Sequence, residues 1–197
     1  MSVASTTGRA LGPIESVIDL IDRARSLNFV VIAELVGLLS EDALRSALDR
    51  AQRRHPLLGV CIVRRGADAS FSSEGVGAIP LERIDGGDVH ALAEREMNVP
   101  LPRERGPLVR CVWIVEPDAP QRSTLLLTFN HTVGDGTSGA LLMRDIVALA
   151  GGSVDGPPLP MPAPLEAHLP PWTRGPRGLW RLLRFIAGLG LAFAGEH

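Results

Sequence analysis

Two nearly continuous apolar segments, followed directly by a histidine, limit most strongly how this chain can fold. Residues 108–116 (LVRCVWIVE) and 123–130 (STLLLTFN) are both predicted to be strands. Successive side chains of a strand point to opposite faces of a sheet, so apolar residues at nearly every position predict that both faces are covered. The connection between the segments is short, which favours an antiparallel pair.

Hydrophobic spacing and turn residues predict further elements along the chain. They are a strand at 28–36, a helix from Ser40 to Pro56, a strand at 57–64, a loop or weak edge strand at 66–77, and helices at 88–97 and 137–150.

The composition changes near residue 151. Residues 151–178 contain half of the chain's proline and little periodicity, which is typical of a linker. Residues 179–197 begin with LWRLLRFIAGLGLAFA, an amphipathic pattern that is shorter than the roughly 20 apolar residues of a membrane-spanning helix. We therefore predict an N-terminal domain over 1–150, a linker over 151–178 and an amphipathic helix over 179–197.

Charge and cysteine content narrow the classes of partner. The chain has 20 basic and 22 acidic residues, so it has no basic surplus to neutralise a nucleic-acid backbone, and we expect no nucleic-acid partner. Cys61 and Cys111 lie in apolar segments, which predicts buried free thiols in a reduced setting. The first 16 residues lack the apolar stretch of a secretory signal, and a cytoplasmic location is expected.

The segment 130–137 (NHTVGDGT) lies between a predicted buried strand and a predicted helix. A histidine at the end of a rigid strand presents its imidazole at a fixed point, and at its ordinary pKa near 6.5 it is mostly neutral and can accept a proton. His131 is therefore a candidate general base. Gly134 and Gly136 predict tight backbone conformations closed to other residues, and Asp135 suits an N-cap or an ion pair with an arginine.

Other interpretations of these residues stay open. His131 can be a structural histidine bonded to a turn, and Asp135 can be only the N-cap of the next helix. The start of that helix can bind a phosphate or carboxylate, although the chain lacks a glycine-rich phosphate-binding fingerprint. No metal is expected, because no third ligand is evident near His131 and Asp135. His55 is interpreted as part of a helix end at Arg-His-Pro.

Residues 131–136 (HTVGDG) resemble the His-x-x-x-Asp-Gly motif of the thioester-dependent acyltransferases that share the chloramphenicol acetyltransferase fold. That superfamily includes condensation domains of nonribosomal peptide synthetases, polyketide-associated acyltransferases and wax ester synthases. The resemblance continues in order through residues 9–16 (RALGPIES), 27–58 and 106–110 (GPLVR). It implies an α/β two-layer sandwich with a mixed or mostly antiparallel sheet and covering helices, present as its N-terminal half.

The resemblance also implies an activity, namely acyl transfer from a coenzyme A or carrier-protein thioester to an alcohol or amine. His131 would be the general base, Asp135 would belong to the catalytic site, and Asn130, Gly134 and Gly136 would shape it. No tightly bound cofactor is implied, since acyl-CoA or a phosphopantetheine thioester is the co-substrate. Peptide-forming condensation domains usually have a second histidine where this chain has Asn130, which favours an alcohol acceptor.

The resemblance leaves one alternative open. The family builds its tunnel between two similar halves, and the second half, with its Asp-Phe-Gly-Trp-Gly motif, is not found in these 197 residues. The chain can therefore be a catalytically silent relative that acts as a binding module, or one half of a split acyltransferase. Its expected partner is the thioester donor, and a second half-domain, a homo-oligomer and peripheral membrane contact through 179–194 are further candidates.

Overall fold

The structure, a computed structural model, describes residues 8–168 together with Gly175, Gly178, Trp180 and Arg184. It divides into two compact units, residues 1–162 and 163–197. The described part of the second unit contains a short 3-10 helix, η2 (Leu165–His168). Apart from Trp180 and Arg184, the amphipathic helix predicted at 179–197 lies outside the described residues.

A four-stranded mixed sheet forms the centre of the first unit, in the order β2 (Asn28–Val36), β7 (Arg122–Asn130), β6 (Val109–Val115) and β5 (Leu81–Asp85). Strand β7 is antiparallel to both of its neighbours, whereas β5 and β6 are parallel. The strands predicted at 108–116 and 123–130 are confirmed, and so is their antiparallel pairing.

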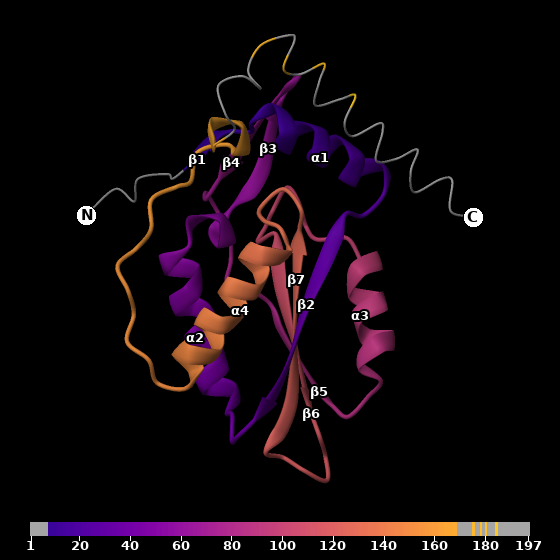
Figure 1. Cartoon of the computed structure of the whole chain (residues 1–197), viewed down its shortest axis with the longest axis vertical. Helices are drawn as coiled ribbons and strands as arrows, with labels where there is room; N and C mark the ends of the chain where they lie inside the picture. Colours follow the sequence, from indigo (N-terminus) through magenta and orange to yellow (C-terminus); the bar gives the residue numbers. More distant parts are fainter. Residues whose placement is uncertain (1–7, 169–174, 176–177, 179, 181–183, 185–197) are drawn as a thin grey trace. The chain divides into compact units, whose positions relative to one another are not determined.

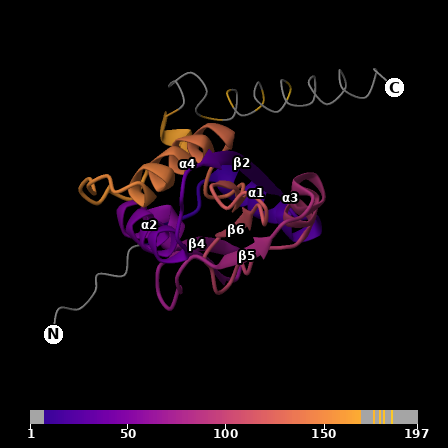
Figure 2. The ribbon, with the colours of Figure 1, turned by 90° about the horizontal axis from the view of Figure 1, so that it is seen from below.

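Helices cover both faces of this sheet (Figure 1, Figure 2). Helices α2 (Glu41–Arg54) and α4 (Gly136–Ala150) pack on one face, and α3 (Val89–Asn98) packs on the other. Leu125 and Leu127 of β7 lie in the apolar cluster with α2 and α4, whereas Leu126 between them lies in the cluster with α3. The unbroken apolar sequence of β7 follows from this arrangement, because both of its faces are buried.

A smaller antiparallel sheet has the order β1 (Gly8–Ala10), β4 (Asp68–Ser72) and β3 (Cys61–Arg65). The expectation of a loop or weak edge strand at 66–77 was wrong, because β4 is the central strand of this sheet. Only Phe71 of its five residues is fully buried, which explains the weak apolar signal. The strand predicted at 57–64 begins later, because Pro56 starts a 3-10 turn, η1 (Pro56–Gly59).

Helix α1 (Pro13–Ala24) has an unusual orientation, because its buried face is acidic. Asp19 is fully buried and pairs with Arg103 and with Arg64, whose Nη2 lies 2.6 Å from the carboxylate. Glu15 is also buried and accepts two hydrogen bonds from Arg9. The exposed face carries apolar side chains, namely Val17, Leu20 and Ile21. Charge pairing, rather than apolar packing, therefore holds this helix to the unit.

The first twelve residues of the predicted linker, 151–162, belong to the first compact unit. The backbone N–H of Leu159 donates to the carbonyl of Arg54 over 2.8 Å, and Arg50 pairs with Asp155. The predicted limits at residues 150 and 178 stay predictions.

Both cysteines are buried and free, as the sequence predicts. Burial raises the pKa of Cys111 to about 12, so this thiol stays protonated. Among the described helices, none combines the length and the apolar content needed to cross a membrane.

Candidate functional site

His131 directly follows the last residue of the buried strand β7. Its backbone N–H donates to the carbonyl of Leu27 over 3.1 Å, which ties the end of β7 to the start of β2. The side chain is exposed, and its ring packs against Phe29 with 4.6 Å between the ring centroids and 41° between the planes. An aromatic contact on a rigid sheet thus orients the exposed imidazole.

Phe29 is itself held by two neighbours. Its ring stacks on Phe129 of β7, with centroids 5.1 Å apart. Helix α4 crosses next to it at Gly139, where an added Cβ would lie 2.9 Å from Phe29 Cε2 and 2.8 Å from Val31 Cγ2. Only glycine leaves room for this close approach of α4 to β2. Neither Phe29 nor Gly139 lies in the motif, and the sequence pattern predicted neither as a site residue.

Asn130 fixes the turn that follows His131. Its side chain is buried, and Oδ1 accepts hydrogen bonds from the backbone N–H of Thr132 over 3.0 Å and from Thr132 Oγ1 over 2.6 Å. These two bonds hold the turn after His131, and the predicted role of Asn130 in shaping a catalytic site stays a prediction.

Asp135 is the N-cap of α4. Its Oδ1 accepts from the backbone N–H of Ser138 over 2.8 Å, and the hydroxyl of Ser138 accepts from the backbone N–H of Asp135 over 2.8 Å. The hydrogen bonds from the side chain and backbone of Ser138 lower the pKa of Asp135 below its ordinary value. The N-cap interpretation is confirmed, and no arginine pairs with Asp135 in the described part of the chain. A part for Asp135 in catalysis stays a prediction.

The two motif glycines differ from the expectation of special backbone conformations. Neither Gly134 nor Gly136 has a positive φ, so that expectation was wrong. An added Cβ on Gly134 would lie 2.9 Å from Ser138 Oγ, which makes Gly134 a packing requirement of the cap. At Gly136 an added Cβ would meet nothing within 4 Å. Only Gly134 is therefore required by the observed loop.

An apolar cavity of about 290 Å³ lies beside the motif loop. It is lined by residues of β2, β7, η1 and α4, by His55 and by residues 159–162, and it is partly open. Its lining residues are Phe29, His55, Pro56, Leu57, Leu58, Phe129, Val133, Gly134, Ser138, Gly139, Leu141, Leu142, Asp145, Leu159, Pro160 and Pro162. Val133, Gly134 and Ser138 come from the motif loop and the start of α4, so the cavity and His131 share both that loop and the ring of Phe29.

Two titratable groups line the same cavity. His55 is the C-cap of α2, as its predicted place in a helix end requires, and its Nε2 lies 3.5 Å from Asp145 Oδ2 of α4. Burial lowers the pKa of His55, and the Asp145 carboxylate opposes this shift. The pair links the C-terminal end of α2 to the interior of α4. The sequence could not indicate this pairing, because the two residues are ninety positions apart.

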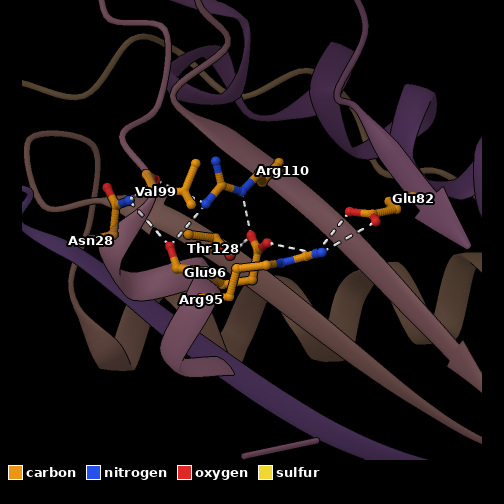
Figure 3. Close-up of polar contacts among 7 residues, drawn as sticks. All are labelled: Asn28, Glu82, Arg95, Glu96, Val99, Arg110 and Thr128. Atoms are coloured by element: carbon orange, nitrogen blue, oxygen red, sulfur yellow. Dashed lines mark hydrogen bonds and ion pairs between the residues drawn. The ribbon is translucent and has the colours of Figure 1, made fainter. Parts of the chain in front are cut away.

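Arg110, from the segment GPLVR that resembles the acyltransferases, lies on the α3 face of the sheet. Its guanidinium donates through Nε to the carboxylate of Glu96 (Figure 3). Through Nη2 it donates to the backbone carbonyls of Glu96 and Val99, and both of these bonds are 2.9 Å long. Thr128 Oγ1 and Arg95 also donate to this carboxylate, and Asn28 donates to the Val99 carbonyl. Arg110 thus holds the end of α3 to the sheet and does not pair with Asp135.

Glu96 is almost fully buried. Burial opposes its ionisation, but the hydrogen bonds from Arg110, Thr128 and Arg95 outweigh that effect and lower its pKa. Within the described residues, no cluster of three or more His, Cys, Asp or Glu side chains could hold a metal ion.

No family model matches the chain. Over 138 residues the chain is 30% identical to phosphinothricin tripeptide synthetase PhsC of Streptomyces viridochromogenes. This match covers 62% of this chain and 12% of that protein. The condensation domain of the monacolin K polyketide synthase MokA superposes with a TM-score of 0.65 at 16% identity, over 77% of this chain and 36% of that one.

A starter condensation domain gives a similar match. A double mutant of that domain from the rhizomide synthetase RzmA, in complex with C8-CoA and Leu-SNAC, superposes with a TM-score of 0.62 at 17% identity, over 76% of this chain and 37% of that one. The chain thus has the chloramphenicol acetyltransferase-like fold of the condensation-domain superfamily, as the resemblance predicts. Within that fold it corresponds to the N-terminal half, and it spans well under half of each of these two condensation-domain chains.

Proposed function

We propose that this half-domain serves acyl transfer from a coenzyme A or carrier-protein thioester to an alcohol or amine, with His131 as general base. The observation that carries the proposal is the position of His131. The imidazole follows a strand that is buried from Ser123 to Asn130, packs on Phe29 and is exposed near an apolar cavity that Phe29 also lines. A fixed, accessible base next to apolar space is what deprotonation of a bound acceptor needs. The complex of the RzmA domain with C8-CoA supports an acyl thioester as donor.

The chemistry follows from one proton transfer and one acyl transfer. The neutral imidazole takes the proton of the acceptor O–H or N–H while the acceptor oxygen or nitrogen attacks the thioester carbonyl carbon. The tetrahedral intermediate collapses, the C–S bond breaks, and the imidazolium returns the proton to the leaving thiolate. The donor thioester becomes a free thiol and an ester or amide is formed, so the imidazole ends as it began.

The test is thiol release from a panel of acyl-CoA donors with alcohol and amine acceptors. A general base is worth about 100-fold to 10,000-fold in rate, so His131→Ala is expected to lower turnover by at least about 100-fold. His90→Ala is the matched control, because His90 is an exposed histidine on α3. Equal loss in both variants, or turnover that survives His131→Ala, would rule out this role of His131.

A second candidate is a catalytically silent binding module or one half of a split acyltransferase. It predicts that the folded chain binds acyl-CoA but releases no thiol, and that His131→Ala leaves binding unchanged. Turnover that appears only when a second polypeptide is added would identify the split enzyme.

A further inference from the structure

We propose that Asn28 and Asn130 hold one buried water between strands β2 and β7, and that Asn28 is thereby a positioning residue for His131. The positioning role rests on the proposed acyl transfer, because it concerns the group that would act as base. The water site itself does not depend on that activity. Asn28 lies outside the motif, on a strand that is far from it in sequence.

Asn28 and Asn130 lie directly opposite one another in the antiparallel pair of β2 and β7. The backbone N–H of His131 donates to the carbonyl of Leu27, which makes these two residues a hydrogen-bonded pair of the ladder. Asn28 and Asn130, one step further along, are therefore a non-hydrogen-bonded pair. In such a pair the side chains share one face of the sheet and come closest, with about 4.5 Å between the Cα atoms.

Hydrogen bonds to other residues fix the orientation of both amides. Asn28 Nδ2 donates to the carbonyl of Val99 over 2.8 Å and to that of Glu96 over 3.4 Å (Figure 3). Asn130 Oδ1 accepts from the backbone N–H and the hydroxyl of Thr132. Turning either amide over would break these bonds. The atoms left over are thus an acceptor, Asn28 Oδ1, and a donor, Asn130 Nδ2.

Both of these atoms are buried, and neither has a hydrogen-bond partner among the described residues. Asn130 as a whole is only 1% exposed. An unpaired donor or acceptor in the interior is costly, and buried polar groups without a protein partner are usually bound to an ordered water. One water that accepts from Asn130 Nδ2 and donates to Asn28 Oδ1 would satisfy both atoms.

This water would complete a chain of hydrogen bonds from α3 to the motif turn. Arg110 Nη2 and Asn28 Nδ2 donate to the same two carbonyls at the end of α3. At the other end of the chain, Asn130 Oδ1 holds Thr132. His131 lies between Asn130 and Thr132 in the sequence, so its backbone would be held on both sides. A fixed backbone limits where the imidazole can lie, as a base that must meet a bound acceptor requires.

The first experiment detects the water by NMR in the 197-residue chain. A rotating-frame Overhauser contact between water and the Nδ2 protons of Asn130 is expected in the wild type. It should be lost in Asn28→Val, which has no acceptor for the water. Asn98→Ala is the matched control, because Asn98 is an exposed asparagine of α3 whose Nδ2 donates to the carbonyl of Glu94. No contact in the wild type would overturn the water site, whether or not the variant folds, and so would a contact that persists in folded Asn28→Val.

The second experiment measures thiol release from acetyl-CoA. Folded Asn28→Val is expected to lower kcat about 10-fold to 100-fold and to leave KM unchanged, because the base is displaced while substrate contacts remain. Asn98→Ala should change neither constant. An unchanged kcat in Asn28→Val, or a change in KM alone, would overturn the positioning role and keep the enzyme. The Overhauser contact in a wild-type chain that releases no thiol with any donor would keep the water site and remove both the proposed function and the positioning role.

Discussion

The ring of Phe29 on β2 lies against the imidazole of His131 at the end of β7, with 4.6 Å between the centroids. The two residues are far apart in sequence and meet because β2 and β7 pair along their whole length, with Asn28 opposite Asn130. The position of the candidate base is thus set by a strand that does not contain the motif.

Replacing Phe29 by leucine should reduce turnover without unfolding the chain. An aromatic pair contributes about 0.5–1.5 kcal/mol, so kcat with acetyl-CoA is expected to fall roughly 2-fold to 10-fold. A short donor is used because Phe29 also lines the cavity. Phe129→Leu is the control, since it removes the other ring of the stack but leaves the contact with His131. The same fall in kcat for both variants would mean that Phe29 acts only through packing.

Asp135 should contribute to stability mainly as an N-cap. Asp135→Ala is expected to lower the free energy of unfolding by about 0.5–2 kcal/mol, whereas Asp135→Ser keeps an oxygen acceptor and should stay close to the wild type. Urea denaturation measures both, with Asp118→Ala at an exposed loop position as control. If Asp135→Ser is as stable as the wild type but no longer releases thiol, the carboxylate contributes to the reaction as well as to the N-cap.

Gly139 should tolerate no side chain. An alanine Cβ would come within 3 Å of both Phe29 and Val31, and overpacking of this kind costs about 1–3 kcal/mol. Gly136→Ala provides the comparison, because its Cβ meets nothing and φ is not positive, so a neutral change or a gain of about 0.4–1 kcal/mol is expected. Chemical denaturation of the two variants tests this difference, and equal stabilities would contradict the close approach of α4 to β2.

The buried pair of Glu96 and Arg110 should make stability depend on acid. Breaking such a pair costs about 3–5 kcal/mol, so Glu96→Gln should be strongly destabilised at neutral pH. The pKa of Glu96 is lowered in the folded state, so its contribution is complete above the ordinary value of 4.5 and is lost as the pH falls through the lower folded-state value. The stability difference between the wild type and Glu96→Gln should therefore shrink as the pH falls below 4.5.

Glu82→Gln is the control for that measurement. Glu82 pairs with Arg95 at the surface and is half exposed, and such pairs contribute about 0–1 kcal/mol. A pH-independent difference for Glu96→Gln, or an equal effect of Glu82→Gln, would show that the buried network does not depend on the ionised carboxylate.

Elements with strong periodicity were predicted from the sequence, and elements held by charge were not. The helix that starts at the N-cap Ser40 and the strands β2, β6 and β7 lie close to their predicted positions, because their apolar patterns report directly on burial. In helix α1 the apolar pattern does not report burial, since Asp19 is buried and Leu20 is exposed. Its position depends on arginines distant in sequence, and no local pattern indicates them.

The candidate site divides in the same way. The order of residues in the motif is enough to predict that His131 follows a strand and that Asp135 caps a helix. The contact with Phe29 and the pair of His55 with Asp145 arise only after strands and helices pack, so spacing along the chain contains no sign of them. The close packing at Gly139 could not be predicted either, because a helix can also contain an isolated glycine without any packing requirement.

The full-length pairing of β2 with β7 has a consequence for insertions and deletions. Removing one residue between Phe29 and Val36 would send every earlier side chain of β2 to the opposite face, so Phe29 would leave His131 while the motif itself stayed intact. A substitution in β2 alters one contact, whereas a change of length alters all of them. The length of this strand is therefore under stricter constraint than most of its individual residues, and an intact motif in a chain with a shortened β2 does not guarantee an intact site.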